Sequence, residues 1–121
     1  MRTVAQALGD DAEELVAQRL SQAGWRIVGR KVRVGRAEID ILAVDPGDPC
    51  LVAVEVRWRR RRDFGLPEET VSRAKLLRLR AALASLRLDA GDSLAVPPLP
   101  ARVDVVAVEP GGRVRHHQGV G

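Results

Sequence analysis

Two β-type segments separated by a short turn restrict the fold of this chain more than any other part of its sequence. Residues 37–44 and 51–58 are rich in β-branched and other apolar residues. Between them, residues 45–49 read Asp-Pro-Gly-Asp-Pro, a composition typical of turns. This pattern predicts an antiparallel hairpin whose side chains alternate between two faces. The register of the hairpin decides what each face carries, because a slip of one residue moves every side chain to the other face.

Helical and β-type patterns flank this hairpin on both sides. The sequence predicts a helix over 5–23 and a strand over 25–34 before it. After it we expect a helix from about residue 67 to 88, a strand over 102–108 and a short edge strand over 113–116. The order αβββαβ(β) predicts an α/β fold, with a mixed sheet of four or five strands flanked by two helices.

Each predicted helix carries an apolar stripe at helical spacing, which we expect to pack on the sheet. The first stripe consists of Leu8, Ala12, Leu15, Val16, Leu20 and Ala23, and the second of Val71, Ala74, Leu77, Ala81, Ala84 and Leu88. Alternation along the first hairpin strand places Ile39, Ile41 and Ala43 on one face, and Glu38, Asp40 and Leu42 on the other. Gly24 is the expected C-cap of the first helix.

The bulk properties favour one cytoplasmic domain over residues 1–121. At this length roughly two-thirds of the unfolded surface can be buried, which allows one real core. No apolar run approaches the roughly 20 residues that span a bilayer, and the first residues lack the apolar middle of a signal peptide. Cys50 is the only cysteine, which excludes an internal disulfide and a multi-cysteine metal site. We therefore expect no membrane association, and no feature of the sequence sets an oligomeric state.

The positive charge of the chain suggests an anionic partner. The formal net charge is +4, and Lys31 and Lys75 are the only lysines, so arginine supplies nearly all of the positive charge. Nucleic acid is the leading candidate partner for a basic domain. An arginine-rich surface that only keeps the protein soluble is an equal alternative on charge alone.

The predicted hairpin brings acidic side chains together. If its centre lies within the turn, so that the numbers of paired residues sum to 95, Asp40 faces Glu55 and Glu38 faces Arg57, all on one face. Directly opposed side chains have Cβ atoms about 5 Å apart, and like charges at that distance destabilise the hairpin. Either a cation between the carboxylates or a retained proton must therefore compensate.

A hard divalent cation such as Mg²⁺ or Mn²⁺ matches these oxygen ligands, so Asp40 and Glu55 are the predicted metal ligands. Such a metal lowers the pKa of a bound water and stabilises charge on a phosphodiester. Arg57 could hold a phosphate, and Glu13 on the first helix could approach the metal from above the sheet. The alternative is an ordinary Glu38–Arg57 ion pair beside two carboxylates on a solvated face.

The sequences Ala-Glu-Ile-Asp-Ile-Leu over 37–42 and Val-Glu-Val-Arg over 54–57 resemble the core motifs of the YraN-like family of predicted endonucleases, G-E-I-D-L-I and V-E-V-K. That family is similar in turn to the PD-(D/E)XK nucleases, whose fold is the restriction-endonuclease-like α/β core. The resemblance covers most of the chain, and its further matches are Glu13, Leu20, Gly24-Trp25, Phe64-Gly65, Pro67, Lys75 and residues 102–106.

This resemblance implies phosphodiester hydrolysis of DNA or RNA, including branched or single-stranded forms, with Asp40 and Glu55 as ligands of Mg²⁺ or Mn²⁺. It implies that Glu38 is an accessory acid and that Glu13 is a further catalytic residue. Arg57 stands where the family has a lysine, and arginine stays protonated whereas lysine can help to activate a water. Three functions remain open. The first two are a metal-dependent nuclease and a non-catalytic nucleic-acid-binding protein that keeps the nuclease fold. The third is a small scaffold protein that binds another protein, for which the sequence offers no particular interface.

An arginine run follows the predicted ligand Glu55, and we expect it to contact phosphates. The predicted nucleic-acid-binding residues are Arg57, Arg59, Arg60, Arg61 and Arg62 and, on the resemblance alone, Lys75. A solvated loop is the alternative for residues 59–62. We expect Trp58 to pack in the core or on the sheet rim, and His116-His117 to lie in a frayed tail, because that pair lacks a third metal ligand.

Overall fold

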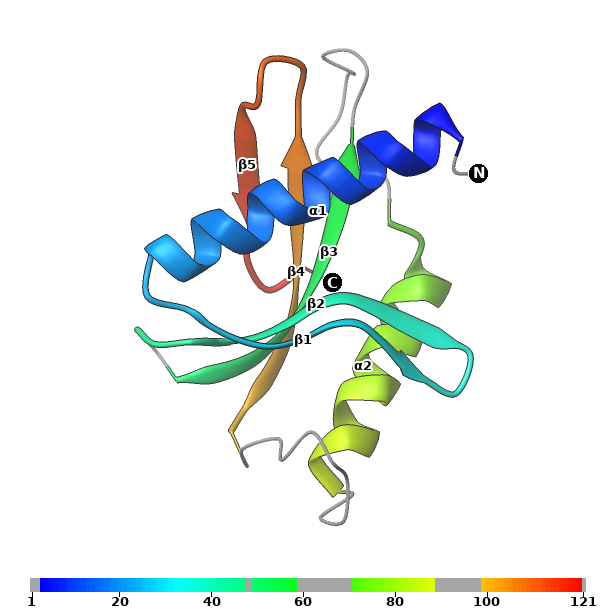
Figure 1. Ribbon diagram of the computed structural model, residues 1–121. Coiled ribbons are helices and arrows are strands. Elements are labelled where there is room, and N and C mark those ends of the chain that lie inside the picture. Colours follow the sequence, from blue (N-terminus) through cyan, green and yellow to red (C-terminus); the bar gives the residue numbers. More distant parts are fainter. Residues whose placement is uncertain (1–2, 48, 59–70, 89–98, 121) are drawn as a thin grey trace.

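The chain folds into a five-stranded sheet between two helices (Figure 1). The computed structural model describes residues 3–47, 49–58, 71–88 and 99–120. The elements are α1 (Val4–Gln22), β1 (Arg26–Val34), β2 (Ala37–Asp45), β3 (Cys50–Trp58), α2 (Arg73–Leu88), β4 (Ala101–Val108) and β5 (Val114–His117). The strands lie in the order β1-β2-β3-β4-β5, with β3 and β4 parallel and all other neighbours antiparallel. This mixed sheet confirms the predicted α/β fold and its restriction-endonuclease-like order of elements.

Both ends of α1 are fixed by local hydrogen bonds. At the N-terminus, Thr3 and Gln6 form a reciprocal capping box. At the C-terminus, the Trp25 N–H donates to the Leu20 carbonyl across Gly24, which has φ of +91°. Gly24 therefore terminates the helix as predicted. Within the parts of the chain that the structure describes, neither helix is long and apolar enough to cross a membrane.

The sheet has an apolar core on each face, and α1 and α2 cover opposite faces (Figure 1). On the α1 face, buried residues of that helix pack on Ile41, Ala43, Val52, Val54, Val106 and Val108. On the α2 face, the leucines of that helix pack on Ile39, Leu42, Leu51, Ala53, Val103 and Val105. The central strands β3 and β4 supply residues to both cores, which explains why their sequences are apolar almost throughout.

The predicted apolar stripe of α2 is wrong. The buried residues of this helix are Leu76, Leu79, Ala82, Leu83 and Leu86. In the predicted stripe, Leu77 is 52% exposed and Leu88 is 85% exposed, and only Val71, which precedes the helix, is buried. Two faces of α2 have helical spacing, and the face with four leucines removes more apolar area from water than the predicted, alanine-rich face.

The alternation of β2 breaks at Asp40. Ile39 packs in the α2-side core, whereas Ile41 packs in the α1-side core, so the prediction that both lie on one face is wrong. The β1–β2 pairing passes from Arg30–Ile41 to Val32–Ile39, and Lys31 between them has φ of +51°, a left-handed conformation. This local irregularity of β1 lies beside Asp40, at the point where the alternation of β2 changes.

Several predicted residues fall outside the described ranges. The arginine run over 59–62, Phe64-Gly65, Pro67 and the predicted start of the second helix all lie outside them.

Candidate metal centre

The β2–β3 hairpin has the predicted register. Its paired residues run from Asp45–Cys50 to Ile41–Val54, and the same register continued by one residue brings Asp40 across from Glu55. At that point a side-chain contact continues the pairing, because the Val56 N–H donates to Asp40 Oδ2 at 2.9 Å. The Asp40 carboxylate is therefore anchored directly to the strand that carries Glu55.

Glu55 is a buried carboxylate held by a lysine from α2. Its side chain is 3% exposed, and Oε1 lies 2.6 Å from Lys75 Nζ. The Ser72 hydroxyl caps the start of α2 by accepting the Lys75 N–H, which fixes Lys75 in the first turn of the helix. Arg57 is more distant, with its Nε at 3.6 Å from Glu55 Oε1. The second carboxylate oxygen, Oε2, is buried without a hydrogen-bond partner.

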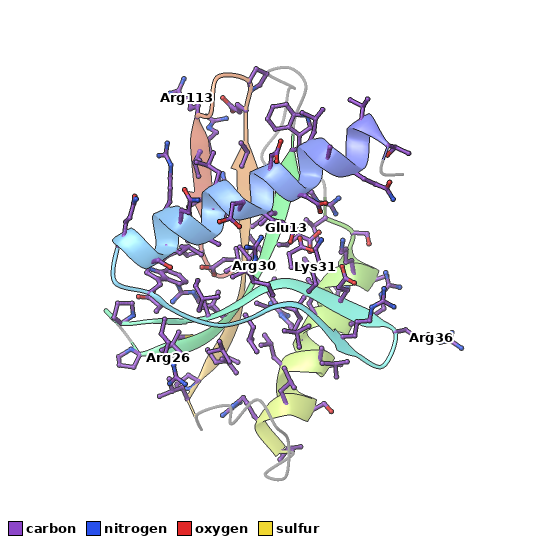
Figure 2. The ribbon with its side chains drawn as sticks, in the orientation of Figure 1. Glu13, Arg26, Arg30, Lys31, Arg36 and Arg113 are labelled. Atoms are coloured by element: carbon purple, nitrogen blue, oxygen red, sulfur yellow. The ribbon has the colours of Figure 1, made fainter. Side chains whose placement is uncertain are left out.

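The Glu13 side chain approaches the candidate site from α1, as the sequence predicted. Figure 2 shows Glu13 and Lys31 between this helix and the β1–β2 hairpin. Glu13 Oε2 lies 3.3 Å from Lys31 Nζ, which also lies 3.1 Å from Asp10 Oδ1. The other oxygen of Glu13, Oε1, is buried without a partner.

The charges of Glu55 and Glu13 act on the Asp40 carboxyl. Burial and the nearby charge of Glu55 raise the pKa of Asp40 to about 7, and the charge of Glu13 adds to this rise. The Val56 N–H and the Lys75 ammonium act in the opposite direction but do not cancel it. The centre therefore carries the like-charge repulsion that the sequence predicted between Asp40 and Glu55.

The donor set fits a hard divalent cation. Unpartnered, buried carboxylate oxygens on Glu13 and Glu55 are the type of ligand that Mg²⁺ and Mn²⁺ prefer. The described residues contain no group of three or more acidic, histidine or cysteine side chains gathered closely enough to hold a metal by themselves. Mg²⁺ usually binds one or two protein carboxylates and keeps several waters, so Asp40 and Glu55 suffice. A pocket of about 250 Å³ lined by Asp40 and Lys75 offers room for these waters.

Glu38 and Arg57 do not form the ion pair that the sequence left open as an alternative to the metal site. Glu38 lies opposite Arg33 on β1, and its Oε2 is 3.3 Å from the Arg33 Nε. Arg57 lies near Glu55 instead, and Glu38 lines the same pocket as Asp40. Trp58 packs against the α1-side core, in agreement with the expectation.

Most of the chain matches a known family. Residues 12–108 match the profile described as "Uncharacterised protein family UPF0102". The UPF0102 protein of Symbiobacterium thermophilum is 46% identical over 114 residues, which cover 93% of this chain and 92% of that protein. The chain belongs to the UPF0102 family. UPF0102 proteins of Roseiflexus castenholzii and an Arthrobacter species are 44% and 43% identical, over 89% and 94% of this chain and 83% and 95% of their own. Membership confirms the YraN-like resemblance of the hairpin motifs.

Among solved structures, this UPF0102 chain is similar to Pyrococcus furiosus SfsA in complex with Ca²⁺. The identity is 17% and the TM-score is 0.37, and the match covers 97% of this chain and 64% of the SfsA chain. With an identity and a TM-score this low, the similarity assigns no function to the chain.

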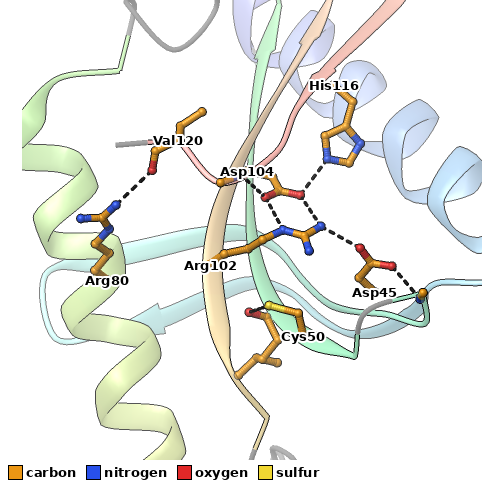
Figure 3. Close-up of polar contacts among 10 residues, drawn as sticks. Asp45, Cys50, Arg80, Arg102, Asp104, His116 and Val120 are labelled. Carbon is orange, nitrogen blue, oxygen red and sulfur yellow. Dashed lines mark hydrogen bonds and ion pairs between the residues drawn. The ribbon is translucent and has the colours of Figure 1, made fainter.

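Sequence reasoning missed a second polar cluster of this UPF0102 protein, centred on Asp104 (Figure 3). Asp104 is fully buried and accepts hydrogen bonds from Arg102, His116 and the Gly119 N–H. His116 therefore lies in β5 with a defined partner, and the prediction of a frayed tail is wrong. The available signal was the Arg-x-Asp spacing in β4, which places Arg102 and Asp104 on the same face of the strand.

Proposed function

We propose that this UPF0102 protein is a Mg²⁺- or Mn²⁺-dependent nuclease that hydrolyses phosphodiester bonds of DNA or RNA. One observation carries the proposal: Asp40 and Glu55 lie together in a partly buried centre where Glu55 Oε2 has no partner. A buried polar atom without a hydrogen bond is costly, and a bound cation removes that cost. The motif resemblance and the family membership support the same function.

The residues of the centre have separate roles in this proposal. Asp40 and Glu55 hold the metal, which when bound supplies an acidified water and positive charge beside the phosphate. Lys75, at 2.6 Å from Glu55, balances the carboxylate charge. Arg57 cannot release its proton, so it acts as a fixed cation for a phosphate oxygen. Lys75 thus places a lysine ammonium beside Glu55 from α2, whereas position 57 carries an arginine.

Cleavage assays test the reaction. We would incubate single-stranded, branched and duplex substrates with the protein and Mn²⁺, and compare wild type with Asp40→Asn and Glu55→Gln. Both variants should lose cleavage, whereas Asp11→Asn, which neutralises an exposed acid of α1, should retain it. Cleavage that is equal in wild type and Asp40→Asn would overturn the proposal.

Thermal unfolding tests metal binding independently of turnover. A ligand at roughly 100 times its Kd adds about 2.7 kcal/mol to the stability of the native state. We expect Mn²⁺ to raise the Tm of wild type and Asp11→Asn, and to have little effect on Asp40→Asn or Glu55→Gln. An equal rise in all four proteins would show that the metal binds elsewhere.

The second candidate function is nucleic-acid binding without catalysis. It is favoured by the Lys75–Glu55 ion pair, which balances the buried charge without a metal, and by arginine at position 57. This function predicts salt-sensitive binding with no turnover and no response of the Tm to Mn²⁺. A metal-dependent rise in Tm that requires Asp40 would exclude it in favour of the nuclease.

A further inference from the structure

A groove runs from the candidate metal centre along the space between the β1–β2 hairpin and α2. One part, of about 250 Å³, is lined by Asp40 and Lys75, and the adjoining part, of about 290 Å³, continues along α2 to Ala81 and Ser85. The two parts share Arg36 and Ala37 from the hairpin and Arg78 from α2, so they adjoin each other. We call the two parts together the hairpin groove, with Arg36, Ala37, Asp40, Lys75, Arg78 and Ala81 as its defining residues.

The two walls of the hairpin groove carry cations that are not neutralised. Arg36 lies at the tip of the β1–β2 hairpin (Figure 2), and Arg78 faces it from α2; both are exposed. Neither forms an ion pair within the described ranges, whereas Arg30 and Arg33 of the same hairpin pair with glutamates. The groove therefore attracts an anionic chain at the point where its two parts join.

Beyond these arginines the lining becomes apolar. Val34 lines the distal part from the hairpin, and Ala81 and Ala82 line it from α2. Their small side chains leave a smooth surface on which sugars or bases can lie. A cationic stretch followed by an apolar stretch matches a polymer with alternating phosphates and apolar faces.

The position of Asp40 in the lining of the groove favours one strand. Asp40 lines the first part, so a phosphodiester must enter the groove to reach it. A single strand can enter such a groove, whereas paired bases hold a second backbone beside the first.

We propose that the hairpin groove binds a single strand of nucleic acid. Its phosphates contact Arg36 and Arg78, its sugars or bases lie against Ala81, and the backbone is led to Asp40. The proposal rests on the proposed function for its link to the metal centre. The binding itself needs no metal, so it can be measured separately from cleavage.

Charge reversal is the first test. We would measure the fluorescence anisotropy of a labelled single-stranded oligonucleotide, and of the same strand in a duplex, in a chelating buffer. Arg36→Glu and Arg78→Glu should each weaken single-strand binding roughly tenfold and reduce the salt slope by about 0.7 per lost phosphate contact. Arg26→Glu and Arg113→Glu make the same charge change at exposed positions away from the groove (Figure 2) and should change Kd less than about twofold.

A second pair of variants distinguishes binding in the hairpin groove from attraction to the overall charge of α2. Ala81 and Ala84 are both exposed on this helix, but Ala81 lines the hairpin groove and Ala84 lines a different cleft. Ala81→Glu should weaken binding roughly tenfold, and Ala84→Glu should not. If the groove variants and the control variants weaken binding equally, the hairpin groove is not the binding site. If a duplex binds as tightly as the single strand, the proposed preference for a single strand is wrong. Binding that depends on the groove but is not accompanied by cleavage would support this inference. It would contradict only the proposed nuclease activity.

Discussion

At the scale of single residues, the Asp40 carboxyl binds its proton more tightly in the folded protein than in the unfolded chain. Burial and the charge of Glu55 raise its pKa from 3.8 to about 7. The folded state therefore keeps a proton that the unfolded chain has released, and stability falls as the pH rises between these two values. We expect Asp40→Asn, measured by urea unfolding in a chelator, to be roughly 1 kcal/mol more stable than wild type near pH 8. Near pH 4 the two should be similar, and a variant less stable than wild type near pH 8 would contradict this electrostatic account.

The Lys75–Glu55 pair provides a second residue-level prediction. Glu55 is 3% exposed, so Lys75→Met leaves a buried carboxylate without its 2.6 Å partner. We expect a cost of about 2–3 kcal/mol, slightly below the usual range for a broken buried pair because Lys75 is partly exposed. The double variant Lys75→Met/Glu55→Gln should recover part of this loss in the same urea titration. A double variant whose loss equals the sum of the two single losses would show that the two residues do not interact.

The central pair of the site was predictable from the sequence, but its partners were not. Asp40 and Glu55 follow from the turn, because its position fixes the hairpin register. The partner of Glu38 was misassigned because β1 lies on its other side and offers Arg33. Only the family resemblance pointed to Lys75, since its contact with Glu55 depends on how α2 packs on the sheet.

At the scale of elements, α2 shows why periodicity alone can select the wrong face. The helix is rich in leucine and alanine, so two stripes satisfy helical spacing, and burial follows the face with more apolar area. We expect Leu79→Ala, at a position 2% exposed, to lower the free energy of unfolding by about 2–5 kcal/mol. Leu77→Ala, at a position 52% exposed, should change it by less than about 0.5 kcal/mol. Equal losses in a urea titration would contradict the orientation of the helix.

At the scale of the whole molecule, the Asp104 cluster joins segments that are distant in the sequence. Arg102 Nη2 reaches Asp45 Oδ2 at the β2–β3 turn at 2.8 Å, while Asp104 holds His116 of β5 and the Gly119 N–H (Figure 3). The cluster therefore joins β4 to β5 and to the turn of the β2–β3 hairpin, whose strands carry Asp40 and Glu55. It stabilises the scaffold from outside the candidate metal centre.

This arrangement predicts how the protein responds to acid. Burial alone would raise the pKa of the Asp104 carboxyl, but hydrogen bonds from His116, Arg102 and the Gly119 N–H outweigh it and hold the pKa below its ordinary value of 3.8. The ionised carboxylate therefore contributes stability above that value, and the contribution is lost as the pH falls through the lowered pKa. Asp104→Asn should cost about 3 kcal/mol near neutral pH, because Arg102 then loses one of its two carboxylate partners and the buried network is broken.

The same variant distinguishes the effect of the Asp104 cluster on stability from that of the candidate metal centre. Asp104→Asn lacks the carboxyl that titrates, so urea unfolding at descending pH should show wild type losing more stability than the variant below about pH 4. Asp104 lies outside the metal centre, so Mn²⁺ should still raise the Tm of the variant if the metal binds at Asp40 and Glu55. Parallel losses of stability in wild type and variant on acidification would show that other carboxylates determine the acid sensitivity of the fold.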